Sequence, residues 1–132
     1  MGIAPGRPAL DRFIAAPAGV VWRLLTDLQS WPSWGPSVRG AELSDGATTL
    51  SAGSRGVVWT VLGARLPFTI TRWEDGRRWD WTVAGVPATG HEVVPESGGC
   101  RVRFEVPWWA VGYLPVCAAA LRRLEGMASG PA

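Results

Sequence analysis

Residues 38 to 106 alternate apolar and polar side chains in short runs that are separated by turn residues. The turns "SDGATT", "EDGRR" and "PESGG" carry Asp-Gly or Gly-Gly pairs, which are typical of hairpin connections. Parallel neighbours would need long crossovers between the runs, so this spacing predicts an antiparallel meander. We expect six strands, near residues 38–44, 54–62, 66–74, 79–85, 88–95 and 100–106.

The last of these strands shows that the sheet has one apolar and one polar face. In "CRVRFEV" the residues Val102, Phe104 and Val106 share one face, while charged residues occupy the other. An apolar sheet face must be covered by another layer. Pro107 ends the strand, and residues 108–129 then predict one long helix, the one long element available as that cover. Its apolar stripe contains Leu114, Cys117, Ala118, Leu121 and Leu124.

A strand, a helix and a tight bend precede the meander. Residues 9–16 predict a first strand, with either Leu10 or Phe13 turned toward the core. Pro17 suits the first turn of a helix, where its missing N–H is not needed. The helix has one apolar stripe at the expected spacing, formed by Val21, Leu24, Leu25 and Leu28. Its end is set by Pro32, and residues 31–36, "WPSWGP", predict a second short, kinked helical turn.

Composition excludes several classes of partner. The chain has 132 residues and a net charge of +2, and its 13 basic residues are all Arg, scattered without a basic stripe. Nucleic-acid binding is therefore not expected. The longest uncharged run, residues 106–121, is broken by two prolines and a glycine, so we expect no membrane insertion. The N-terminus has no signal-peptide pattern, which favours a cytoplasmic protein. We expect a single domain over residues 1–132, with residues 1–8 as a loose end, and a monomer or a homodimer.

The chain shows no pattern of a metal or cofactor site. Cys100 and Cys117 lack metal-ligand or redox spacing, and we interpret both as apolar fillers, although the sequence leaves a disulfide between them open. There is no His/Cys/carboxylate cluster, no Ser-His-Asp arrangement and no Gly-rich phosphate loop. We therefore predict neither a metal nor a cofactor.

Three segments resemble the START/polyketide cyclase superfamily, the helix-grip fold of the birch-pollen allergen. The first runs from Ala16-Pro17 through Val21-Trp22 to "WPSWGP"; the others are "GHEVVPESGGCRVRFEV", with Cys100 where Thr is usual, and "LRRLEG". The resemblance implies an α+β helix-grip fold, in which a curved antiparallel sheet of about seven strands wraps around a long C-terminal helix. Two short helices after the first strand would close one end of a cavity between sheet and helix, with "WPSWGP" as its plug.

The nine Trp residues and the strand alternation predict how such a cavity is lined. An apolar, aromatic lining suits a hydrophobic or aromatic small molecule. The alternative is that the same side chains fill the space themselves. Arg72 is either a group at the pocket rim or a solvated charge. Our candidate ligand-binding residues are Trp59, Phe68, Ile70, Arg72, Trp79, Trp81, His91, Phe104, Trp109, Leu114, Ala118 and Leu121, with Trp59 placed inward alongside Val57 and Val61.

His91, the sole histidine, is the candidate catalytic residue. Its ordinary pKa suits a general acid or base for enolisation or cyclisation, as the resemblance to cyclase-like proteins implies; the alternative is a hydrogen-bonded structural histidine. We thus expect a protein that binds a hydrophobic or aromatic ligand, as a polyketide cyclase/dehydrase-like protein. The alternatives are a non-enzymatic lipid or quinone carrier, or a protein-interaction module with a filled pocket that docks through Trp108 and Trp109. Sugar binding is disfavoured because the chain has no Asn and almost no Gln.

Overall fold

The structure is a computed structural model that describes residues 7–129. Its helices and strands follow one another in nearly the order that the sequence predicts. Each turn between consecutive strands of the meander contains at least one glycine with a positive φ angle. In chain order they are β1 (Ala9–Ile14), α1 (Ala18–Thr26), the 3-10 turn η1 (Leu28–Ser30), α2 (Trp31–Trp34), β2 (Val38–Leu43), β3 (Arg55–Thr60), β4 (Arg65–Glu74), β5 (Arg78–Val83), β6 (Val86–Glu96), β7 (Gly99–Glu105), the 3-10 segment η2 (Trp108–Tyr113) and α3 (Leu114–Ala128).

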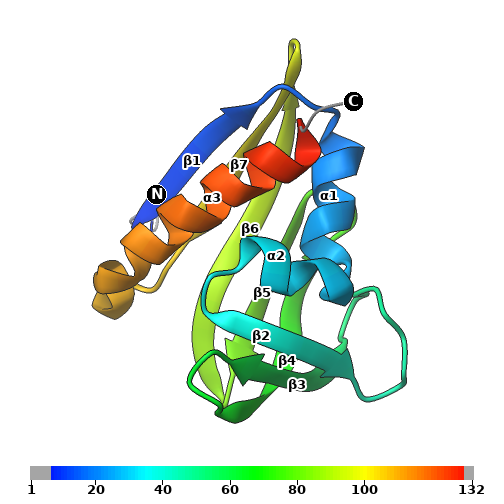
Figure 1. Cartoon of the computed structure of the whole chain (residues 1–132), viewed down its shortest axis with the longest axis vertical. Coiled ribbons are helices and arrows are strands. Elements are labelled where there is room, and N and C mark those ends of the chain that lie inside the picture. Colours follow the sequence, from blue (N-terminus) through cyan, green and yellow to red (C-terminus); the bar gives the residue numbers. More distant parts are fainter. Residues whose placement is uncertain (1–6, 130–132) are drawn as a thin grey trace, which may run out of the picture.

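The seven strands form one antiparallel sheet in the order β1-β7-β6-β5-β4-β3-β2. The meander from β2 to β7 is continuous, and β1 joins it through β7. The sheet curves so that α3 crosses its concave side, with α1 and α2 beside it (Figure 1). This is the expected α+β helix-grip architecture.

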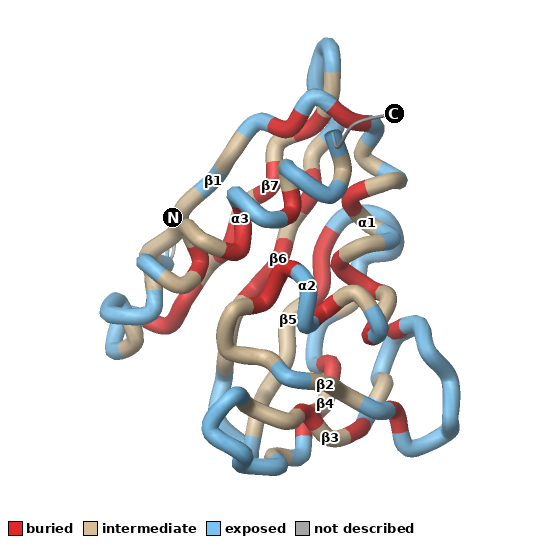
Figure 2. The backbone as a smooth tube through the Cα atoms, viewed as in Figure 1, coloured by how far each residue is buried: buried red, intermediate tan, exposed pale blue. Residues whose placement is uncertain are grey.

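The core lies between the concave face of the sheet and the helices, where Figure 2 shows the buried segments. Val93 and Val102 from the sheet and Leu124 from α3 have no exposed surface. The α1 stripe behaves as predicted at Val21 and Leu25, which are also fully buried. An apolar face on each layer is therefore covered by the other.

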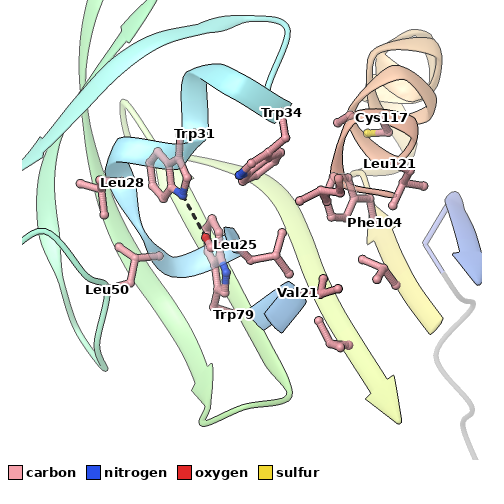
Figure 3. Close-up of a cluster of buried hydrophobic side chains, with 14 of the residues drawn as sticks. Val21, Leu25, Leu28, Trp31, Trp34, Leu50, Trp79, Phe104, Cys117 and Leu121 are labelled. Carbon is pink, nitrogen blue, oxygen red and sulfur yellow. Dashed lines mark hydrogen bonds between the residues drawn. The ribbon is translucent and has the colours of Figure 1, made fainter. Parts of the chain in front are cut away.

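The segment "WPSWGP" forms α2 and the bend after it, with Pro32 in the first turn of the helix. The indole N–H of Trp31 donates to the carbonyl of Leu25 at 2.9 Å (Figure 3), and that of Trp34 donates to the carbonyl of Leu24, also at 2.9 Å. These carbonyls lie in the last turn of α1, where helix geometry leaves them without a partner. The two indoles thus fasten α2 to α1 while their rings are buried in the core.

The structure changes one detail of the sequence prediction and decides two that the sequence left open. The long helix begins at Leu114 and not at Trp108, because Ala110 has non-helical backbone angles and residues 108–113 form η2 instead. In β1, Leu10 packs on the core, whereas Phe13 is 36% exposed. Cys100 and Cys117 are both buried and free. This agrees with the interpretation that they fill space in the core, and no disulfide joins them. Most of the expected loose end, residues 1–6, lies outside the described residues.

A charge cluster on the outer face of the sheet holds the central strands in register. Arg78 of β5 reaches across β6 to Glu105 of β7 at 2.8 Å and also binds Asp80 at 2.9 Å. Gly90 of β6 makes room for it, since a Cβ there would lie 2.6 Å from the guanidinium. The hydrogen bond to Arg78 is the main reason that the pKa of Glu105 falls to about 2. Each of these residues is next in sequence to a residue of the opposite, concave face.

Candidate ligand-binding cavity

A cavity of about 590 Å³ opens at the end of the sheet that α1 and α2 do not cover. Its wall is formed by β3 to β6, the β3–β4 loop, and η2, which is the short coil before α3 in Figure 1. Its volume lies within the usual range for small-molecule sites. The lining residues are Ser37, Val38, Val58, Thr60, Val61, Leu62, Ala64, Leu66, Trp81, Val83, Val86, Pro87, Ala88, Thr89, Val106, Pro107, Trp109, Ala110 and Tyr113.

A second cavity of about 40 Å³ adjoins it on the side of α2. It is bounded by aromatic rings, among them Trp34 and Phe104, whose centroids are 5.8 Å apart (Figure 3). Trp79, His91 and Cys117 complete this end. The two cavities share five lining residues, which therefore form the boundary between them: Ser37, Val38, Trp81, Thr89 and Tyr113.

A chain of hydrogen bonds runs along this boundary. The Trp81 indole N–H donates to the hydroxyl of Thr89 at 3.0 Å, and that hydroxyl lies 2.9 Å from Nε2 of His91. The other ring nitrogen, Nδ1, is 3.2 Å from the carbonyl of Trp79. The pairing of β5 with β6 shifts register between Asp80 and Thr82, which gives β6 one extra residue beside Trp81. Such a bulge turns a side chain away from its regular direction, and here Thr89 meets Trp81.

His91 is a neutral, fixed group in this chain. Its side chain is buried and stacks on Trp79 with ring centroids 3.9 Å apart. Burial is the main cause that lowers the pKa of His91 to about 3; the nearby charge of Arg78 adds to the lowering, and the hydrogen bond to the Trp79 carbonyl opposes it. A carbonyl can only accept, so Nδ1 carries the proton and donates to Trp79, and Nε2 accepts from Thr89. An imidazole held in this way is not protonated to the acidic imidazolium at neutral pH, and its one N–H and its one lone pair are both already engaged.

The structure brings some of the predicted residues together and leaves others apart. Trp79, Trp81, His91 and Phe104 meet at the small cavity, and Trp109 joins Trp81 at the large one. Five others lie in the core or along α3 without lining either cavity: Phe68, Ile70, Leu114, Ala118 and Leu121. Phe68 packs between Trp31 and Trp81, with centroid distances of 5.8 and 5.4 Å. The α3 face toward the small cavity carries Ala120 in place of Ala118.

Two predicted residues face away from the cavity, and each has a physical reason. The β4–β5 pairing shifts register between Ile70 and Arg72, so Arg72 no longer shares the face of Ile70 and binds Glu74 in solvent at 2.7 Å. In β3 the inward residue is the buried Val58, which places its neighbour Trp59 on the opposite face. There the guanidinium of Arg65 lies 4.9 Å from the Trp59 ring centroid.

Sequence reasoning missed most of the wall of the large cavity. Residues 85–90, "GVPATG", look like a turn, but β6 already begins at Val86. Ser37 and Tyr113 were also missed; their hydroxyls are hydrogen-bonded to each other across the boundary, joining the segment before β2 to η2. Val86 and Ala88 were a usable signal, because neither residue type is among those that turns favour.

The mouth of the large cavity is bordered by exposed apolar side chains. Leu62 is 93% exposed and Trp109 is 55% exposed, and both line the cavity. Trp108, one residue earlier, is 77% exposed. Both members of the Trp pair are therefore open to solvent, Trp109 at the rim and Trp108 next to it in the chain, and large exposed apolar groups of this kind commonly mark sites of interaction.

A comparison with known protein families identifies the family of this chain. A family model described as "Polyketide cyclase / dehydrase and lipid transport" matches residues 9–128. The chain belongs to this family. A search of curated proteins gives no match. No helix within residues 7–129 is long and apolar enough to cross a membrane. In the same part of the chain, no three His, Cys, Asp or Glu residues are grouped to hold a metal ion.

Solved structures of this fold come from several bacteria. A protein from Staphylococcus saprophyticus superposes with a TM-score of 0.74 at 13% identity, covering 92% of this chain and 90% of its own. One from Mesorhizobium loti gives 0.73 at 16% identity, covering 91% and 94%. One from Nitrosomonas europaea gives 0.64 at 21% identity, covering 94% of each chain. At such identities the likeness establishes the shared fold and nothing about ligand or reaction.

Proposed function

We propose that this protein binds a hydrophobic or aromatic small molecule in the large cavity and holds it without chemical change. The observation that carries the proposal is the 590 Å³ cavity with its lining of aliphatic and aromatic side chains and a few hydroxyls. Burial of a ligand's apolar surface in such a cavity makes a favourable contribution to the free energy of binding. The family description, which includes lipid transport, is consistent with it.

The state of His91 favours binding over cyclase-like turnover. A general acid or base works best with a pKa near the working pH, and the pKa of His91 is about 3. Both of its ring nitrogens are already hydrogen-bonded. No carboxylate, lysine or arginine lines either cavity within the described residues. We therefore assign His91 a positioning role, in which it fixes the hydroxyl of Thr89 at the inner end of the cavity.

The exposed Trp108 and Trp109 support a second candidate, a protein-interaction module. That hypothesis assumed a pocket filled by its own side chains. The large cavity speaks against this assumption, and Trp109 contributes to the cavity wall itself. We therefore prefer the binding function and treat contact with a partner as secondary to it.

The binding function can be tested by titrating the protein with Nile red, a neutral lipophilic dye, and by native mass spectrometry of freshly purified protein. Ala88 lines the large cavity, so Ala88→Phe fills it from within. Thr69 precedes the buried Ile70 on β4 and faces the other side of the sheet, so Thr69→Phe adds a ring outside the cavity. We expect saturable dye binding in the wild type and Thr69→Phe and at least a tenfold loss in Ala88→Phe, because the new ring occupies space in the cavity that the dye would otherwise fill.

Equal binding by all three proteins would place the dye elsewhere and end the proposal. So would a wild type that neither binds the dye nor carries a co-purified lipophilic mass. Circular dichroism and thermal unfolding of the two variants establish that the comparison is made between folded proteins.

A further inference from the structure

The hydroxyl of Thr89 has its hydrogen-bonding roles fixed by its neighbours. The indole of Trp81 can only donate, so Thr89 Oγ1 accepts from it at 3.0 Å. Nε2 of His91 must accept, because Nδ1 donates to the carbonyl of Trp79. The Thr89 proton is therefore directed at His91, across 2.9 Å. What Thr89 retains for a ligand is one acceptor lone pair and no donor.

The environment of that lone pair excludes charge. Among the described residues, every polar side chain on the wall of the large cavity is a hydroxyl or an indole. The small cavity adds only the neutral imidazole and a thiol. An ionised carboxylate or phosphate at the inner end would lose its hydration without gaining a cation or a donor from Thr89, which is strongly unfavourable. Arg78, whose charge acts on His91, lies on the other face of the sheet and is already paired with two carboxylates.

We infer that the ligand is an uncharged lipophile that places a hydroxyl or phenol donor on Oγ1 of Thr89, with its apolar body in the large cavity. The inference rests on the proposed binding function and narrows its ligand class. Thr89 is then the residue that determines specificity. A ligand without the donor leaves the Thr89 lone pair buried and unpaired, and a ligand that would bring a charge to the inner end is rejected.

The test uses three probes of one ring system, each competing with Nile red at about pH 7.5. The first, 2-naphthol, is neutral and carries a donor; 2-methoxynaphthalene is neutral without one; 2-naphthoate is ionised at this pH. We expect 2-naphthol to compete roughly tenfold better than 2-methoxynaphthalene, because an unpaired buried polar group is costly. The anion should compete more weakly than either neutral probe.

Thr89→Val keeps the shape of the side chain and removes the hydroxyl, and Thr89→Ser restores the hydroxyl. The preference for 2-naphthol over its methyl ether should vanish in Thr89→Val and persist in Thr89→Ser. If Thr89→Val does not fold, the Trp81 indole proton in wild-type NMR spectra serves instead. Its chemical shift should change more with 2-naphthol than with the ether, because the Trp81 indole and the hydroxyl of 2-naphthol would both donate to Oγ1 of Thr89.

Tight binding of 2-naphthoate, or equal binding of the alcohol and the ether by the wild type, would overturn this inference while leaving the binding function in place. A preference for 2-naphthol that survives in Thr89→Val would also overturn the inference, because a residue other than Thr89 would then accept the hydrogen bond from the ligand. Failure of Nile red itself to bind removes the proposed function and this inference together.

Discussion

The two ends of the concave sheet face differ sharply although the same strands build them. At the end covered by α1 and α2, Trp31 stacks on Trp79 with centroids 5.6 Å apart, and both rings are almost fully buried. We call this the closed end. At the other end, aliphatic side chains, a few hydroxyls and the rings of Trp81, Trp109 and Tyr113 surround a cavity of about 590 Å³, which we call the open end.

Tryptophan content therefore does not by itself indicate a binding cavity. Trp31 and Trp34 act as a plug at the closed end, where their indole N–H groups also satisfy the end of α1. The open end instead owes its space to small side chains on β6 and to η2, which stands away from the sheet where a regular helix was expected. We therefore propose that the closed end contributes most of the stability and that the open end binds the ligand.

The largest expected effect comes from removing the plug. Trp31→Ala should lower the free energy of unfolding by about 3–5 kcal/mol, as for other large buried aromatic residues. The matched change at the open end, Trp109→Ala, removes a half-exposed ring and should cost less than about 1 kcal/mol. Urea unfolding followed by circular dichroism measures both. Similar losses in the two variants would abolish the distinction between the ends.

His91 gives the boundary between the ends a pH signature. Its folded-state pKa is about 3 against 6.5 in a free side chain, so protons bind the unfolded chain more readily between these values. Stability is then complete above pH 6.5 and falls with decreasing pH, by about 2 kcal/mol between pH 7 and pH 5. Urea midpoints over this range should show the slope in the wild type. In His91→Gln, which cannot titrate, a slope of the same size would mean that another group is responsible.

The smallest effect is expected at the rim of the open end. Leu62→Ser and Trp108→Ser replace side chains that are mostly in solvent, and each should change the free energy of unfolding by less than about 0.5 kcal/mol. Thermal unfolding compares them with the wild type. A large destabilisation in either would show that the rim is packed against the core, and would contradict an open mouth.

The sequence predicts the closed end far better than the open end. Strand alternation and the Asp-Gly turns give all six strands of the meander, and the "WPSWGP" motif gives α2, because these signals are local. The prediction of the cavity wall fails where a strand shifts register or where the wrong face of a strand is taken as the inward one. One residue of bulge in β4 turns Arg72 to solvent, and strict alternation from Val57 puts Trp59 on the wrong face.

Thr89 could not have been found from its own sequence neighbourhood. Its role depends on a bulge that brings it to Trp81 and on the tautomer that Trp79 imposes on His91, and both are three-dimensional facts. Likewise the depressed pKa of His91 follows from burial between aromatic rings, whereas the sequence alone offers its ordinary value.

The most direct test of the account is where a neutral aromatic ligand binds, and the nine tryptophans provide the probes. Each indole N–H gives a signal in a ¹H–¹⁵N NMR spectrum, and 2-naphthol can be titrated against all of them. The account predicts saturable shifts at Trp81 and Trp109, which line the large cavity, and none at Trp22 and Trp73, which pack on each other away from it. Shifts confined to Trp22 and Trp73, or no saturable shift at any indole, would contradict it.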